Sequence, residues 1–444
     1  MAILSRDEAQ AILKKILGYS KADECEANLN GGTSGNIRYA RNTVSTGGIQ
    51  NDRTLVMQSA FGKRVGTATV NEFDDASLAK VVARSEELAR LAPENPEYVG
   101  LLGPQTYLES TGYFPATASI TPELRAEAAT KSIELAKARQ LVAAGFWQDN
   151  VGFTSMMNSK GLFAYNTRTN VNFSVTVRTE NSNGSGYASR GYSDVTRLDP
   201  AAASRVAVEK AANSVNARAL EPGKYTVILE PAAAVVLLEN LFFNFDARSA
   251  DEGRSFLSKP GGATKLGQKL VDERVTFYSD PTHPELPTSP WAGDGRPQEK
   301  VTWIEKGVVK NLTYSRYWAQ KKGVKAVPQP DGILMAGGSA SLEDLIRSTP
   351  KGILVTRLWY IREVDPQTVL LTGLTRDGTF YIENGRIAFP VKNFRFNESP
   401  VIMLNNLEAL GRPERVVSGE SEVNYLIPPI KVRDFTFTSL SDAV

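Results

Sequence analysis

The strict alternation of side chains between Phe163 and Val177 constrains the fold of this chain more than any other feature. Apolar, aromatic or threonine residues occupy every second position, and the positions between them are mainly asparagine, arginine and other polar residues. Side chains of a strand point to opposite faces in turn, so one face of this segment is packed and the other is polar. The segment is therefore predicted to be a half-exposed antiparallel strand.

The first part of the chain has the order helix, strands, helix. The first helix begins at a capping box formed by Ser5 and Glu8. Strand and turn signals fill residues 24–70, where two glycine pairs, Gly31-Gly32 and Gly47-Gly48, separate runs rich in valine, threonine and isoleucine. A second helix is expected over about residues 75–92. Its predicted buried side chains are Leu78, Val81, Val82, Leu88 and Leu91.

The same order then recurs. Thr121 and Pro122 predict a helix start, and the helix is expected to continue through about residue 143. Strands follow, among them the alternating segment, and a helix begins at Asp199-Pro200. We interpret the recurrence as an internal duplication.

The C-terminal half is predicted to be rich in strands around one helix. The segment from Ala232 to Phe245 is apolar on nearly every side, so the helix that it forms must be buried all round. Short strands are expected at Val301–Ile304, Val308–Leu312, Ile353–Trp359, Thr368–Thr375, Gly378–Glu383 and Arg386–Pro390.

These patterns predict an α+β fold with a duplicated helix-strands-helix N-terminal half, followed by a strand-rich C-terminal domain with one buried central helix. The predicted domains are residues 1–100, residues 101–220 as a repeat of the first, and residues 221–444.

A single histidine and a single cysteine limit the chemistry of this chain. Among 444 residues, only His283 and Cys25 are of these types. A histidine-containing triad, a cysteine–histidine pair and a two-histidine zinc site therefore lack residues, unless His283 acts alone. His283 lies in a proline-rich loop without carboxylates at ligand spacing, which favours a solvated loop residue. Two glutamates flank Cys25 and disfavour its thiolate, which indicates an inert structural residue.

Charge and hydropathy point to neither a nucleic acid nor a membrane as a partner. The 51 basic and 49 acidic residues leave a formal charge of +2. The longest apolar run, from Ala232 to Leu238, is far shorter than the roughly 20 residues that span a bilayer. Acidic residues interrupt the N-terminal segment, so we expect no secretory signal and a cytoplasmic location.

Two glycine-containing segments are candidate ligand sites. Asn183 to Gly186 lacks the lysine and the following helix of a phosphate-binding loop, so a hairpin turn is favoured. Gly337 and Gly338, followed by Ser339, let another backbone approach closely, and Ser341 marks a helix start. A tight loop and close contact with an extended peptide substrate are the two interpretations of this second segment.

Four carboxylates lie near the apolar helix in the sequence: Glu239, Asp246, Asp251 and Glu252. Such a cluster can hold a hard cation, but helix caps and ion pairs account for these residue types more often.

Six segments of the chain form a pattern whose order and spacing are more informative than any single motif. They are residues 61–68, 235–240, 280–291, 294–309, 312–323 and 381–391. In this order and spacing, which extend over nearly the whole chain, they resemble the TldD/PmbA family, also called the modulator of DNA gyrase family.

The TldD branch of this family carries the motif H-E-x-x-x-H and a C-terminal cysteine, which together resemble a zinc peptidase site. Two alignments place either Leu238, Glu239 and Phe243 or Glu239, Asn240 and Asn244 at the three motif positions. Neither set contains a histidine, and no cysteine follows residue 398. The resemblance therefore implies no metal site in this chain, and no catalytic residue is predicted.

This departure resembles the TldE (PmbA) branch of the family. The resemblance implies a non-catalytic subunit that pairs with a TldD-like subunit in a metallopeptidase acting on unstructured or extended peptides, with zinc held only by the partner. Two alternatives stay open. The chain could be a homodimeric peptide-binding protein without catalysis, or an independent hydrolase that uses Glu239 with Asp246 or Asp251.

Overall fold

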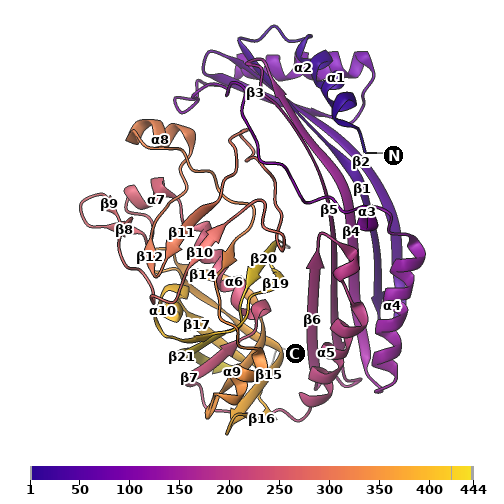
Figure 1. Ribbon diagram of the computed structural model, residues 1–444, viewed down its shortest axis with the longest axis vertical. Coiled ribbons are helices and arrows are strands. Elements are labelled where there is room, and N and C mark those ends of the chain that lie inside the picture. Colours follow the sequence, from indigo (N-terminus) through magenta and orange to yellow (C-terminus); the bar gives the residue numbers. More distant parts are fainter. Residues whose placement is uncertain (1–2, 422, 442–444) are drawn as a thin grey trace.

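A long curved sheet and a strand-rich unit beside it make up the computed structural model, which describes residues 3–421 and 423–441 (Figure 1). The sheet is antiparallel throughout, with the strand order β3-β2-β1-β4-β5-β6. Its strands are β1 (Glu24–Ala40), β2 (Thr43–Phe61), β3 (Arg64–Val70), β4 (Val142–Asn158), β5 (Phe163–Arg178) and β6 (Ser185–Tyr192).

The element order of the N-terminal half is duplicated, as the sequence predicts. Three strands follow α1 (Arg6–Leu17) and precede α2 (Asp75–Leu91), and three more lie between α4 (Pro122–Lys137) and α5 (Pro200–Asn213). The first strands of the two copies, β1 and β4, have 17 residues each and pair at the middle of the sheet. The segments 1–100 and 101–220 therefore share one sheet instead of forming a sheet each.

One face of this sheet is covered by the four helices. Leu13 of α1 and Val82 of α2 pack with Leu29 of β1 in one apolar cluster. Ala129 of α4 and Phe173 of β5 belong to a second cluster under the other half of the sheet. The opposite face of the sheet is turned toward the strand-rich unit (Figure 1).

Three local predictions for this half are wrong. The glycine pairs at 31–32 and 47–48 lie inside β1 and β2 and not in turns. The helix that begins at Pro122 ends at Lys137, since Gln140 has a positive φ of 56° and residues from Val142 onward are extended. Leu91 is 75% exposed, because the buried stripe of α2 passes through Ser85 and Ala89 instead.

The strand-rich unit contains two main sheets around one helix. The first has the order β14-β7-β21-β17-β15-β16, with β18 on β21, and the second has the order β12-β11-β10-β13-β20-β19. The strands of the first sheet are β7 (Gly223–Leu229), β14 (Lys351–Asp365), β15 (Leu370–Glu383), β16 (Arg386–Pro390), β17 (Phe394–Glu398), β18 (Leu407–Leu410) and β21 (Ile430–Leu440). Those of the second are β10 (Phe277–Ser279), β11 (Val301–Glu305), β12 (Val308–Val309), β13 (Leu334–Met335), β19 (Glu414–Val417) and β20 (Asn424–Ile427).

The α+β class and the strand-rich C-terminal half are confirmed, although two strand predictions need correction. The two segments predicted at 368–375 and 378–383 form the single strand β15, which begins at Leu370, and only two residues of 308–312 are extended. The smaller elements are α3 (Pro115–Ala118), a 3-10 turn (Val195–Arg197), α7 (Ala247–Asp251), β8 (Ser258–Lys259), β9 (Ala263–Thr264), α8 (Arg316–Lys322), α9 (Leu342–Arg347) and α10 (Pro400–Asn405).

The central helix α6 (Pro231–Phe243) contacts strands of both C-terminal sheets. Its residues from Ala233 to Leu238 are at most 2% exposed. Phe243 at its end is 63% exposed, so the prediction that this helix is buried all round is wrong at that position. Among the described residues, no helix is long and apolar enough to cross a membrane.

Residues 92–114, here called the strap, run from α2 toward α3 (Figure 1). Glu24 of β1 holds one side of the strap, since its carboxylate accepts hydrogen bonds from the Tyr98 hydroxyl at 2.7 Å and the Leu101 amide at 2.9 Å. The strand-rich unit holds the other side. The Arg316 guanidinium donates to the Gly100 carbonyl at 2.6 Å, and the Tyr107 hydroxyl donates to the Gly295 carbonyl at 2.7 Å. The strap thus ties the two halves of the molecule together.

Candidate functional site

A cleft of about 890 Å³ lies between the helix-free face of the long sheet and the strand-rich unit. We call it the central cleft. The sheet contributes residues from the middle of β1, β2, β4 and β5. The strand-rich unit contributes the end of α6, the loops around residues 286–288 and 329–333, and β19 with β20.

The sheet wall of the central cleft is a grid of polar side chains. The strand registers place Gln50, Ser34, Asn150 and Asn170 in one row across β2, β1, β4 and β5. The Ser34 hydroxyl donates to the Asn150 amide oxygen, and the Asn150 amide group donates to Asn170 at 3.0 Å. These bonds orient the amides, which can donate and accept hydrogen bonds toward a bound chain.

The neighbouring row has charged residues at its ends and no side chains at its centre. Asp52 of β2, Gly32 of β1, Gly152 of β4 and Arg168 of β5 follow one another in register. Both charged side chains line the central cleft and are exposed in it. Gly32 also has a packing role, because a Cβ there would lie 2.3 Å from the Val151 carbonyl oxygen.

Glu239 of α6 is the carboxylate of the opposite wall. Its side chain is buried and accepts a hydrogen bond from the Ser421 hydroxyl at 2.9 Å. Burial raises the pKa of this carboxyl, which the nearby Glu420 charge also favours, while hydrogen bonds from Ser418, Ser421 and Tyr425 act in the opposite direction. Glu239 therefore sits in the wall of the cleft as a hydrogen-bonded, partly desolvated acid.

The other residues that the two alignments place at the positions of the H-E-x-x-x-H motif point in different directions from α6. Phe243 lines the central cleft, whereas Leu238 is buried and does not reach it. Asn240 and Asn244 also lie away from the cleft, where their amide groups donate to the carbonyls of Val236 and Asn240 at 2.7 and 3.0 Å.

The zinc that the resemblance implies for the TldD branch does not fit these residues. Leu238 and Phe243 have no ligand atoms, so Glu239 would be the one donor left in that alignment. Within residues 3–421 and 423–441, no group of three histidine, cysteine, aspartate or glutamate side chains is arranged to hold a metal ion.

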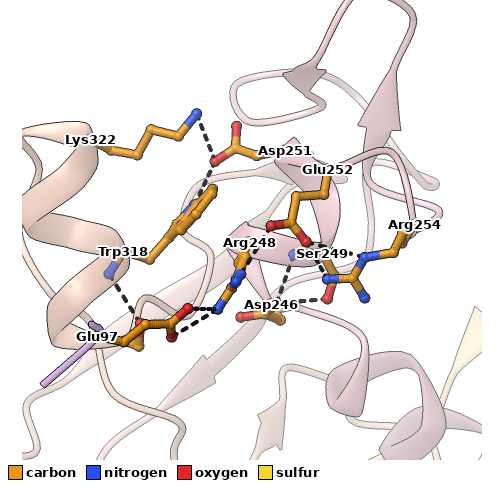
Figure 2. A network of polar contacts seen from close by, with 10 residues as sticks. Glu97, Asp246, Arg248, Ser249, Asp251, Glu252, Arg254, Trp318 and Lys322 are labelled. Atoms are coloured by element: carbon orange, nitrogen blue, oxygen red, sulfur yellow. Dashed lines mark hydrogen bonds and ion pairs between the residues drawn. The ribbon is translucent and has the colours of Figure 1, made fainter. Parts of the chain in front are cut away.

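The three carboxylates that follow α6 act as a helix cap and as ion-pair partners (Figure 2). Asp246 caps α7 by accepting hydrogen bonds from the amide and the hydroxyl of Ser249, both at 2.7 Å. Asp251 accepts a hydrogen bond from the Trp318 indole at 2.8 Å, and Glu252 pairs with two arginines. None of the three lines the central cleft with Glu239, so the structure does not bring the proposed hydrolase residues together there.

The predicted glycine site lies against this chain's own backbone. The Gly338 amide donates to the Gly411 carbonyl at 2.8 Å, and a Cβ on Gly337 would lie 2.4 Å from the same oxygen. Ser339 is exposed beside them, and Ser341 forms the capping box of α9. None of the three predicted residues, Gly337, Gly338 and Ser339, lines the central cleft.

The two residues with reactive heteroatoms are engaged locally. His283 is half-buried in a loop, where its Nδ1 accepts the Glu285 amide at 3.2 Å. Cys25 is 4% exposed, and burial raises the pKa of its thiol.

Most residues of the central cleft were not among the predicted site residues. Asn170 and Arg168 belong to the polar face of the alternating strand, so the sequence did signal that this face is polar. Their neighbours Asp52 and Asn150 lie on other strands, and only the pairing of those strands brings the four together.

Fold and cleft define a two-part α+β protein whose duplicated curved sheet faces a strand-rich unit across a large polar cleft. Residues 119–215 match the family model described as PmbA/TldA metallopeptidase central domain, and residues 222–439 match the C-terminal domain of the same description. The chain belongs to the TldD/PmbA family.

Two relatives with matching sequences differ in how much of the chain they share. A metalloprotease of Archaeoglobus fulgidus is 32% identical over 117 residues, which is 26% of this chain and 26% of that protein. An uncharacterised protein of Methanocaldococcus jannaschii is 23% identical over 385 residues, which is 80% of this chain and 86% of that protein.

Solved structures share the fold over almost the whole length. TldE from Thermococcus kodakarensis matches with a TM-score of 0.84 and 20% identity, over 97% of this chain and 99% of that one. A candidate modulator of a DNA gyrase from Thermotoga maritima matches with a TM-score of 0.85 and 17% identity, over 97% of this chain and 100% of that one. At these identities the structural matches establish the fold.

Proposed function

We propose that this chain is the TldE-like, non-catalytic subunit of a TldD/TldE-type metallopeptidase that hydrolyses unstructured or extended peptides. One observation carries the proposal. A chain of a metallopeptidase family keeps a large cleft beside its central helix, while Leu238 and Phe243 stand where that helix would need metal ligands. The fold shared with TldE supports the same assignment.

The polar sheet wall supports an extended peptide as the substrate. Asparagine, glutamine and serine side chains form hydrogen bonds with peptide groups whatever the side chains of the peptide are. A cleft of about 890 Å³ is within the size range of sites that enclose small ligands, roughly 300–1,000 Å³, and holds a short stretch of extended chain. In this proposal the chain positions the peptide, and a TldD-like partner in the cytoplasm supplies zinc and the hydrolytic step.

The first experiment compares the isolated chain with a reconstituted pair. The full-length chain is expressed alone and together with a relative from the same host that carries H-E-x-x-x-H. We expect substoichiometric zinc and no cleavage of an unstructured peptide by the isolated chain, and co-elution, bound zinc and cleavage by the pair. Stoichiometric zinc together with cleavage by the isolated chain would overturn the non-catalytic assignment.

A second measurement separates the proposal from its alternatives. A stable homodimer that binds peptides and never recruits the zinc-bearing relative would instead indicate a peptide-binding protein. The variant Glu239→Gln keeps the shape of the cleft wall, so the reconstituted pair should retain its cleavage rate. Loss of all cleavage in that variant would favour hydrolysis by a carboxylate of this chain.

A further inference from the structure

The row Asp52–Gly32–Gly152–Arg168 is a channel across the sheet with an acid at one end and a base at the other. Neighbouring strands are about 4.8 Å apart, so the Cα atoms of Asp52 and Arg168 are separated by about 14 Å. The two glycines between them carry no side chain that would fill this space. The parallel row with Asn150 and its hydrogen-bonded neighbours borders the channel on one side.

The two end groups differ from Arg415 and Glu239, two other charged residues of the central cleft whose side chains are hydrogen-bonded within the protein. The Arg415 guanidinium donates to the Glu285 carbonyl at 2.7 Å, and Glu239 accepts from Ser421. The side chains of Asp52 and Arg168 line the cleft and form no hydrogen bond or ion pair with any residue that the structure describes. No hydrogen bond within the protein therefore has to break before these side chains bind a ligand.

We propose that this channel binds a short peptide with free ends, with the ammonium group at Asp52 and the carboxylate at Arg168. An extended peptide advances about 3.4 Å per residue, so about four residues cover the roughly 14 Å between the Cα atoms of Asp52 and Arg168. Guanidinium groups bind carboxylates through paired, charge-assisted hydrogen bonds, and an aspartate does the same for an ammonium group. Such a ligand has the size of a short product of peptide hydrolysis.

Asp331 of the opposite wall sets the strength of the carboxylate end. It lines the same cleft, where burial raises the pKa of its carboxyl and the positive charge of Arg168 acts in the opposite direction. The Asp331 carboxylate therefore competes with a peptide carboxylate for the guanidinium. Removing that charge should tighten binding, whereas removing the Arg168 charge should weaken it.

The inference rests on the proposed function only in assuming that peptides enter the central cleft, and it is tested on the full-length chain without a partner. Calorimetric titration compares tetra-alanine with its N-acetylated form and its C-terminal amide. We expect each blocked form to bind about tenfold more weakly, since each loses one charge-assisted interaction. Dialanine is too short to reach both charges and should bind as weakly as the blocked forms.

Variants assign each end of the peptide. Arg168→Gln should weaken the binding of tetra-alanine about tenfold and leave the affinity for the C-terminal amide unchanged. Asp52→Asn should also weaken the binding of tetra-alanine about tenfold, and it should leave the affinity for the N-acetylated form unchanged. Asp331→Asn should tighten tetra-alanine several-fold. Arg38→Gln removes an exposed guanidinium from β1 outside the cleft and serves as the matched control.

Three outcomes would overturn the inference. Tetra-alanine does not bind, or the free and blocked peptides bind equally well, or Arg168→Gln weakens the binding of tetra-alanine and of its C-terminal amide by the same factor. Thermal unfolding of each variant checks that the fold is retained. Because the experiment requires neither zinc nor a partner, its failure leaves the co-elution and cleavage results of the proposed function unaffected.

Discussion

Arg125 and Asp149 form a buried ion pair beneath the long sheet. The guanidinium of Arg125 on α4 donates two hydrogen bonds to Asp149 of β4, at 2.6 and 2.8 Å, and both side chains are under 10% exposed. The Trp147 indole donates to the same carboxylate at 2.8 Å. Asp149→Ala leaves a buried guanidinium and a buried indole N–H without their acceptor, so we expect a loss of about 3–5 kcal/mol in the free energy of unfolding.

An exposed pair on the same helix provides the control. The Nζ atom of Lys131 and the Oε1 atom of Glu127, both on α4, are 2.6 Å apart, and the two side chains are 53% and 57% exposed. Glu127→Ala should change the free energy of unfolding by less than about 0.5 kcal/mol in the same urea titration. Equal effects of the two variants would show that burial does not determine the strength of the Arg125–Asp149 pair.

Glu239 should make the stability depend on pH in a direction opposite to that of most carboxylates. Burial raises its pKa above the ordinary value of 4.5, so the folded state holds this proton more tightly than the unfolded chain does. Stability from this group is therefore lost as pH rises from the ordinary value through the raised pKa. Glu239→Gln cannot ionise, so it should not show this loss of stability. Each unit by which the pKa is raised corresponds to about 1.4 kcal/mol in the free energy of unfolding.

The measurement is urea unfolding of wild type and Glu239→Gln between about pH 4 and pH 8. The free energy of unfolding of the variant should rise relative to that of the wild type as pH increases. Because all other titrating groups are the same in both proteins, this difference reports on Glu239. A difference that stays constant across this range would contradict a raised pKa at this position.

The sequence predicts that one face of β5, part of the sheet wall of the central cleft, is polar, but it does not predict which residues of that wall lie together. The alternation in β5 predicts that Arg168 and Asn170 lie on a polar face. Nothing in the local sequence places Asp52 opposite Gly32, or Gly152 opposite Arg168, since those neighbours depend on the register of three separate strand pairs. The sequence therefore predicts that these residues lie on a polar face, but it does not predict which residues of the neighbouring strands lie next to them.

At the scale of elements, Gly66 fixes how closely α2 packs on β3. A Cβ at Gly66 would lie 2.2 Å from the Ala89 amide nitrogen and 2.3 Å from the Ser85 carbonyl oxygen, both of them backbone atoms of α2. Gly66→Ala must therefore displace the helix, and we expect a loss of about 1–3 kcal/mol in thermal or urea unfolding.

Gly48 is the matched control for this substitution, because it also lies in a strand of the same sheet. No atom lies within 4 Å of a Cβ placed there, and its φ is not in the positive range. Gly48→Ala should be neutral or stabilising by up to about 1 kcal/mol, since alanine restricts the unfolded chain more than glycine does. A loss at Gly48 as large as that at Gly66 would argue against close helix packing as the cause.

The same glycines explain why element boundaries were partly missed. Gly31-Gly32 has the composition of a turn, yet β1 continues through it because β4 approaches at that point more closely than a side chain would permit. The capping boxes at Ser5 and Ser341 predicted helix starts correctly, because caps depend on residues within one turn. Local hydrogen bonding is encoded locally, whereas close approach between strands depends on tertiary structure.

At the scale of the whole molecule, duplication explains both the long sheet and the central cleft. The first strands of the two copies pair in the middle, so the sheet extends outward through β3 on one side and β6 on the other. The four helices occupy one face, which leaves the other face for the strand-rich unit. The recurrence of elements was visible in the sequence, but the joining of both copies into one sheet was not, because it depends on the pairing of β1 with β4.

The strap contributes hydrogen bonds that help to hold the two halves together. The double variant Tyr107→Phe/Arg316→Gln removes two hydrogen bonds between the strap and the strand-rich unit. Tyr107 of the strap donates one of them to the Gly295 carbonyl, and Arg316 of the strand-rich unit donates the other to the Gly100 carbonyl. Losing a neutral and a charged donor should reduce the free energy of local opening by about 2 kcal/mol, which accelerates exchange of the Leu101 amide about thirtyfold. Exchange of the paired amides in the middle of β1 should stay unchanged, since those bonds lie within the sheet.

Hydrogen exchange by mass spectrometry or NMR measures both regions in one sample. Lys63→Gln is the control for the strap, because the Lys63 ammonium group is exposed and its bond to the Pro96 carbonyl is long, at 3.4 Å. If the double variant accelerates exchange in β1 as much as at Leu101, the two halves unfold as one unit. If only the strap responds, the two hydrogen bonds hold the strap alone, while the Arg197–Glu285 and Lys210–Glu230 ion pairs still join the N-terminal half to the strand-rich unit.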